Sequence, residues 1–176
     1  GRKKRPPIKP LVQDKNMCVP ACIAMILRTI DPPRALDPQV IFKEMEGSAG
    51  VSPWQLDRWL FRNKLYPIDI SVTVEAVRGM LDAGFPLLAT RSKILMCHQE
   101  LIVGYDDSLE ELEVIEPTSG VPIYIPYDQL SENYSQAGES FVALVPMTDP
   151  KNIRYPGRWV DAAGMTARRI LRSVFT

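Results

Sequence analysis

The chain has 176 residues, of which 45% are hydrophobic and 24% charged, proportions typical of a globular protein with one compact core. Its formal net charge is zero, and its apolar runs are shorter than the roughly 18 residues of a membrane span, so no membrane span is expected. No apolar stretch follows the basic residues of segment 1–10, which excludes a secretory signal peptide.

The zero net charge results from basic ends on an acidic body. Residues 1–10 contain five basic residues and no acidic one, residues 151–176 contain six basic residues and one acidic one, and residues 11–150 contain ten basic and twenty acidic residues. We interpret 1–10 as a solvated basic, Pro-rich arm or linker and 11–176 as a single domain, with an amphipathic terminal helix at 159–175. No aromatic residues interleave with the basic arm, so no nucleic-acid partner is expected.

The first predicted helix runs from about Val19 to Arg28 and is apolar on nearly every face. A helix without a polar face is a central, buried one. Pro20 suits its first turn, and the prolines of 31–33 end it. We therefore expect this helix to lie at the centre of the fold.

Three further helices are predicted, at about 38–45, 53–63 and 74–83. The second has the clearest start, because Ser52 and Gln55 have the spacing of a capping box. After these helices the hydrophobic period changes to that of strands.

Five strands are predicted, at 86–90, 99–105, 112–115, 121–126 and 140–146. Pro122 and Pro126 cannot donate ladder hydrogen bonds, so the fourth of these strands is expected at a sheet edge. Helices followed by antiparallel strands indicate an α+β domain.

Two residues could carry nucleophilic chemistry. His98 is the single histidine of the chain, so any imidazole base must be this residue, and it leads into a predicted strand that would hold it rigidly. Cys18 precedes the apolar helix, where unpaired N–H groups and the helix dipole favour a thiolate. Taken alone, each of the two residues is more often structural than catalytic.

Other residues with reactive or aromatic side chains are interpreted as structural. Cys22 lies one turn inside the apolar helix and is predicted to be a small buried hydrophobe, and Cys97 alternates away from the face that His98 uses. Trp54 and Trp59 are predicted as core residues. Three cysteines make neither a disulfide framework nor a zinc site, which leaves buried thiols, a reactive thiol or both. A reducing compartment is the natural place for such thiols, although an exported enzyme could also carry them.

An acid and an amide complete the candidate site. Glu116 ends a predicted strand next to that of His98, where a carboxylate would fix the imidazole tautomer. Asp106 and Asp107 are competitors, but they lie at the turn, at the far end from His98. Gln13 precedes the nucleophile and either joins backbone N–H groups in an oxyanion hole or is an exposed loop residue.

In combination these pieces resemble the papain-like cysteine peptidases, and within them the bacteriocin-processing (double-glycine leader) peptidases. The resembling stretches are Gln13 to Leu27, Gly84-Phe85-Pro86-Leu87-Leu88, His98 to Asp107, Val114-Ile115-Glu116-Pro117 and Phe141 to Pro146. The resemblance implies a papain-like fold in which a helical part with a buried nucleophile helix packs on an antiparallel sheet. It also implies Cys18 as nucleophile, His98 as general base, Glu116 as orienting acid and Gln13 at the oxyanion hole.

The sequence departs from the family pattern at three positions. Val19 stands where the family usually has Gly, Gln13 is one residue closer to the cysteine than usual, and Glu116 replaces an acid that is usually Asp. Some bacterial effector and toxin proteases share a start of the form Asn-Met-x-Cys, and the segment Asn16-Met17-Cys18 of this chain resembles that start. A first residue Gly1 fits a fragment of a larger secreted toxin.

The sequence thus predicts a cysteine peptidase that hydrolyses protein or peptide substrates through a Cys-His-Glu triad, with no metal or cofactor. Such a chain is expected to be soluble and to act as a bacterial cytoplasmic or secreted effector domain in a reducing compartment, with an immunity protein or inhibitor if it is a toxin. A glutamine deamidase or acyltransferase would use the same residues. Two non-enzymatic functions also fit the sequence, namely a non-catalytic peptide-binding domain and a basic-ended module that binds an anionic partner.

Overall fold

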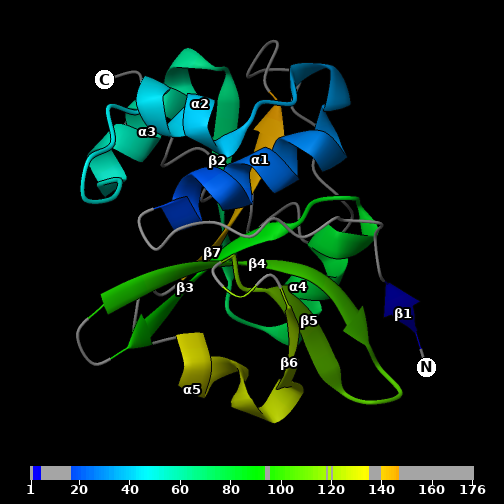
Figure 1. Cartoon of the computed structure of the whole chain (residues 1–176). Coiled ribbons are helices and arrows are strands. Elements are labelled where there is room, and N and C mark those ends of the chain that lie inside the picture. Colours follow the sequence, from blue (N-terminus) through cyan, green and yellow to red (C-terminus); the bar gives the residue numbers. More distant parts are fainter. Residues whose placement is uncertain are drawn as a thin grey trace.

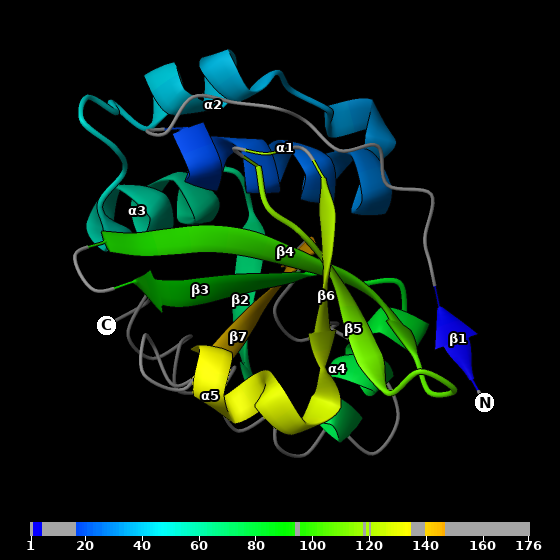
Figure 2. The same cartoon turned by 60° about the horizontal axis from the view of Figure 1, so that its bottom comes forward.

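The computed structural model describes residues 2–4, 17–93, 96–117, 119, 121–134 and 140–146, with the side chains at 92, 93, 96 and 97 left aside. Gln13, the predicted helix at 159–175 and the side chain of Cys97 therefore lie outside the described residues. An antiparallel sheet lies between α1 to α3 (residues 18–62) on one face and α4 and α5 (residues 74–134) on the other (Figures 1 and 2). This arrangement confirms the predicted α+β class.

The sheet is antiparallel throughout, in the order β2-β7-β3-β4-β5-β6, with β1 paired to the end of β4. The strands are β1 (Lys3–Lys4), β2 (Leu65–Ser71), β3 (Leu87–Lys93), β4 (Met96–Asp106), β5 (Glu111–Ile115), β6 (Pro122–Pro126) and β7 (Ser140–Pro146). The proline-bounded strand β6 ends the order, so the edge prediction is confirmed.

Helix α1 (Cys18–Ile30) is the buried helix that its sequence predicts. Its residues Pro20 to Leu27 are all buried. A helix that is apolar on every face avoids exposing apolar surface to water only when other elements cover all its sides. Figure 2 shows α1 between the sheet on one side and α2 (Pro38–Glu44) on the other, with α3 (Pro53–Arg62) beside it.

The starts of two helices are fixed by side-chain caps. Ser52 Oγ accepts from Gln55 N at 3.2 Å, and Gln55 Oε1 accepts from Ser52 N at 2.8 Å, which is the predicted capping box of α3. Helix α4 (Val74–Asp82) begins where Thr73 Oγ1 accepts from Ala76 N at 3.2 Å. It ends before Gly84, whose φ of 91° suits the residue that reverses the chain after a helix.

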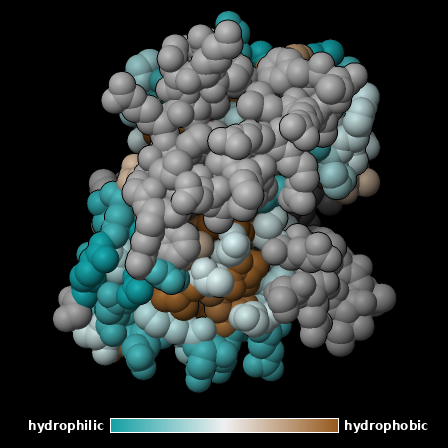
Figure 3. All heavy atoms as spheres, turned by 180° about the vertical axis from the view of Figure 1, so that it is seen from behind, coloured by the Kyte–Doolittle hydropathy of each residue, from teal (hydrophilic) through white to brown (hydrophobic). Residues whose placement is uncertain are grey.

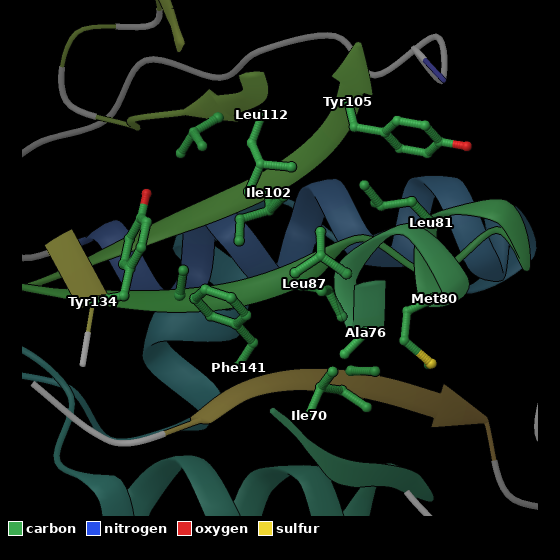
Figure 4. Packing of buried hydrophobic residues seen from close by; sticks show 14 of the residues in the cluster. Ile70, Ala76, Met80, Leu81, Leu87, Ile102, Tyr105, Leu112, Tyr134 and Phe141 are labelled. Atoms are coloured by element: carbon green, nitrogen blue, oxygen red, sulfur yellow. The ribbon is translucent and has the colours of Figure 1, made fainter. Parts of the chain in front are cut away.

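Two hydrophobic cores lie on opposite faces of the sheet. The α1 core contains the buried residues of α1, α2 and α3 together with Leu101 and Val103 of β4. The α4–α5 core lies under α4 and the short helix α5 (Leu130–Tyr134), and it includes Ile102 of the same strand. Figure 4 shows part of this second core, and from behind an apolar patch is visible among hydrophilic residues (Figure 3).

Four features differ from the sequence analysis. Strand β2 and helix α5 were not predicted, β2 because Pro67 disfavours a strand and α5 because five residues are too few to show a period. Lys3 and Lys4 pair with Tyr105 and Asp106, where a solvated arm was expected. Trp59 is buried as predicted, but the core prediction for Trp54 is wrong, because 64% of it is exposed and the Arg58 guanidinium lies 4.5 Å from its ring centroid.

The capping box gives a stability prediction. Ser52→Ala leaves the Gln55 N–H at the start of α3 without its acceptor, so the free energy of unfolding should fall by about 1 kcal/mol. Ser48→Ala is the matched control, because the exposed Ser48 side chain makes no cap, and its effect should stay within about 0.5 kcal/mol. Urea unfolding monitored by circular dichroism measures both, and equal stabilities for the two variants would contradict the assignment.

Candidate active site

Cys18 is the first residue of α1, and it is a free, partly exposed thiol. Among the described residues no side chain caps this helix end, and the first turn of α1 carries no acidic residue. The N-terminal backbone N–H groups and the helix dipole therefore act on the Cys18 position without a nearby carboxylate on α1 to offset them. A helix N-terminus of this kind is a general binding place for anions.

His98 lies near the beginning of β4 and is buried, with 10% of its side chain exposed. Its Nε2 is in contact with Oε1 of Glu116, whose side chain is 14% exposed. Since Nε2 is engaged by the carboxylate, Nδ1 is the ring nitrogen left for a thiol. The structure thus brings the His98 imidazole and the Glu116 carboxylate into contact.

Glu116 is held by the turn that follows β5. Its second carboxylate oxygen, Oε2, accepts from Ser119 N at 2.9 Å, while the Ser119 hydroxyl donates to the Glu116 carbonyl at 3.3 Å. Strand pairing of Leu101 with Ile115 brings the turn beside the first part of β4. The carboxylate therefore has one oxygen for the backbone and one for the imidazole, which fixes its direction.

Packing of α1 on β4 brings the cysteine and the histidine to one end of the molecule. The Cys22 thiol, one turn after Cys18, donates to the carbonyl of Gln99 at 3.8 Å, and Gln99 follows His98 directly. In Figures 1 and 2 the dark-blue beginning of α1 lies on the same side as the beginning of β4. Within the described residues, the Cys18 thiol makes no hydrogen bond with the His98 imidazole.

Cys22 is the inert thiol that the sequence predicts. It is fully buried, and burial raises its pKa well above the usual value, with further increases from the negative charges of Cys18, Glu100 and Glu116.

The two competing carboxylates are engaged elsewhere. Asp106 Oδ1 accepts from Ser108 N at 3.0 Å, and Asp107 Oδ1 accepts from Arg78 Nη1 at 2.9 Å. Both carboxylates lie at the end of β4 remote from His98, so Glu116 is the acid at the imidazole. The proposed oxyanion residue, Gln13, lies outside the described residues and stays a prediction.

Sequence reasoning missed a buried ion pair beside His98. Arg91 Nε donates to Glu100 Oε1 at 2.6 Å, and the Glu100 side chain is only 1% exposed. The sequence contains a signal for it, because Glu100 follows His98 by two residues in a strand, and strand alternation puts the two side chains on one face. A charged residue among the apolar residues of a predicted strand indicates a buried partner of opposite charge.

Solved structures with a similar fold but low sequence identity include two peptidase domains and a cysteine protease. The peptidase domain of Streptococcus ComA, a bi-functional ABC transporter involved in a quorum sensing pathway, is 12% identical with a TM-score of 0.60, over 80% of this chain and 99% of that domain. The N-terminal peptidase C39-like domain of a toxin secretion ATP-binding protein from Vibrio parahaemolyticus is 18% identical with a TM-score of 0.54, over 77% and 100%.

The third, xylellain, is a cysteine protease from Xylella fastidiosa, 11% identical with a TM-score of 0.51, over 84% of this chain and 87% of that one. No protein-family model and no curated protein matches the sequence. The predicted papain-like fold is confirmed by these similarities. Among the described residues no helix is long and apolar enough to cross a membrane.

The two cysteines of α1 should differ sharply in reactivity. At pH 8 the raised pKa keeps Cys22 as a thiol and burial excludes reagent, so iodoacetamide should modify Cys18 and leave Cys22 intact in the folded protein. Peptide mass spectrometry measures both rates. In urea the two rates should converge, and comparable rates in the folded protein would contradict the packing of α1.

Proposed function

From the premise of a papain-like fold, we propose that this chain is a cysteine peptidase that hydrolyses peptide bonds of a protein or peptide substrate. Cys18 is the nucleophile, His98 the general base and acid, and Glu116 the carboxylate that orients the imidazole. The observation that carries the proposal is the contact of His98 Nε2 with a Glu116 carboxylate that the Ser119 backbone holds in place.

The proposed chemistry is acyl transfer in two steps. The Cys18 thiolate attacks the carbonyl carbon of the scissile bond, and the imidazolium of His98 gives its proton to the leaving nitrogen as the carbon–nitrogen bond breaks. The resulting thioester is then attacked by a water molecule whose proton passes to His98, which releases the acid product and the Cys18 sulfur. Glu116 stays ionised throughout and stabilises the imidazolium.

Oxyanion stabilisation is assigned to backbone N–H groups at the start of α1 and to Gln13. The N-terminus of α1 supports the first part, because no side chain of the described residues caps it. The Gln13 assignment rests on its place five residues before Cys18 and on the resemblance.

Two other reactions could use the same residues, and they differ from peptide hydrolysis in the leaving group or in the acceptor of the acyl group. A glutamine deamidase would release ammonia from a side-chain amide, and an acyltransferase would pass the thioester to an amine instead of water. A toxin or effector role, with an immunity protein as partner, stays a prediction from the sequence. The peptide reaction is preferred because the three similar structures are described as peptidase or protease domains.

A mixture of synthetic peptides with varied sequences tests the proposal without knowledge of the substrate. Mass spectrometry should detect new peptide termini with the unmodified protein and none with Cys18→Ala. His98→Ala should lower kcat/KM by on the order of 10²- to 10⁴-fold, because the thiolate loses its base and the leaving nitrogen loses its proton donor. Glu116→Gln should cause a smaller loss, since the amide keeps a hydrogen bond but not the charge.

The matched control for the carboxylate is Glu132→Gln, which changes an exposed residue of α5 and should leave kcat/KM unchanged. Ammonia release without new termini would favour the deamidase. Cleavage that persists in Cys18→Ala would contradict the nucleophile assignment.

A further inference from the structure

The Arg91–Glu100 ion pair lies next to His98 in the sheet. Arg91 of β3 is the backbone partner of His98 across the two strands. Glu100 follows His98 by two residues on β4. The pairing of Leu101 with Ile115 makes Glu116 the next residue opposite Glu100.

The ion pair lies against the apolar α4–α5 core, where the Arg91 guanidinium faces the Tyr134 ring. Neighbours of the ion pair in that core include Leu87, Ala89, Ile102 and Val114. A buried ion pair contributes little to stability, since desolvation of both charges offsets their attraction, and apolar residues of similar volume often serve as well. Stability of the core therefore does not explain why charges stand at these two positions.

The two charges are linked electrostatically to the imidazole. Burial raises the pKa of Glu100, and the Arg91 charge, its hydrogen bond and the His98 charge oppose this rise. The Arg91 guanidinium also lies 5.7 Å from the centroid of the Tyr134 ring, which lines the same side. The charged groups that act on Glu100 in the described chain are Arg91 on β3, His98 on β4 and Glu116 after β5. Glu100 in turn acts on Tyr134 of α5 and on Cys22 of α1.

We propose that Glu100 and Arg91 are positioning residues for His98. The Glu100 carboxylate neutralises the Arg91 guanidinium on the neighbouring strand, so that this positive charge does not repel the His98 imidazolium. Arg91 in turn holds the buried Glu100 in its ionised form. His98 then has two carboxylates nearby, Glu116 in contact with its Nε2 and Glu100 two residues further along the same strand. The consequence for catalysis rests on the proposed peptidase function, whereas the effect on the imidazole does not.

The single histidine makes a direct test possible, because every imidazole signal in an NMR spectrum belongs to His98. The titration is carried out in a Cys18→Ala background, so that the thiol does not couple to the ring. Glu100→Gln leaves Arg91 uncompensated and should lower the pH midpoint of the His98 signals by about one unit. Adding Arg91→Met removes the remaining charge and should return the midpoint toward that of the background protein.

Asp107→Asn is the matched control, because it breaks an ion pair with Arg78 at the other end of β4 and should leave the midpoint unchanged. A Glu100→Gln midpoint equal to that of Asp107→Asn overturns the proposal. A merely structural pair would change stability in circular dichroism melts without moving the midpoint.

If Glu100→Gln does not fold, the background protein itself supplies the test. Coupling between two titrating groups is reciprocal, so the side-chain carboxyl carbon signal of Glu100 must show a step at the His98 midpoint. Absence of that step overturns the proposal. Failure of the peptidase proposal is distinguishable, because it appears as lack of Cys18-dependent cleavage and leaves the His98 titration as predicted here.

Discussion

The packing of α1 on β4 is the constraint on which the candidate site depends. Helix α1 has no polar face, so it must be buried on all sides, and the Cys22 thiol meets the Gln99 carbonyl where the two elements touch. The partly exposed Cys18 begins this helix, and His98 lies one residue before Gln99. The burial of α1 on β4 thus brings the start of the helix, with Cys18, to the end of the sheet where β4 begins.

Much of this arrangement follows from patterns that one sequence contains. Helix α1, the capping box of α3 and the edge position of β6 depend on local chemistry that residue types reveal. The contact of His98 with Glu116 could be predicted because two strands joined by a short turn must be neighbours. Gln13 is untested, because it lies outside the described residues.

The features that sequence reasoning missed are those decided by tertiary context. Strand β2 contains Pro67, and only its place at the edge of the sheet, next to β7, makes the proline acceptable. Trp54 is exposed and stacked by Arg58, although an aromatic residue five positions before buried Trp59 resembles a core residue. The Arg91–Glu100 pair depends on the register of β3 and β4, which no single strand pattern specifies.

The central claim is that Cys18 and His98 form a thiolate–imidazolium pair, and the rate of Cys18 alkylation by iodoacetamide from about pH 4 to pH 9 tests it most directly. The account predicts that Cys18 reacts at a pH where an ordinary thiol, with a pKa of about 8.5, does not, and that His98→Ala removes this reactivity. A Cys18 that titrates like an ordinary thiol in both proteins would contradict the account and favour a peptide-binding domain without catalysis.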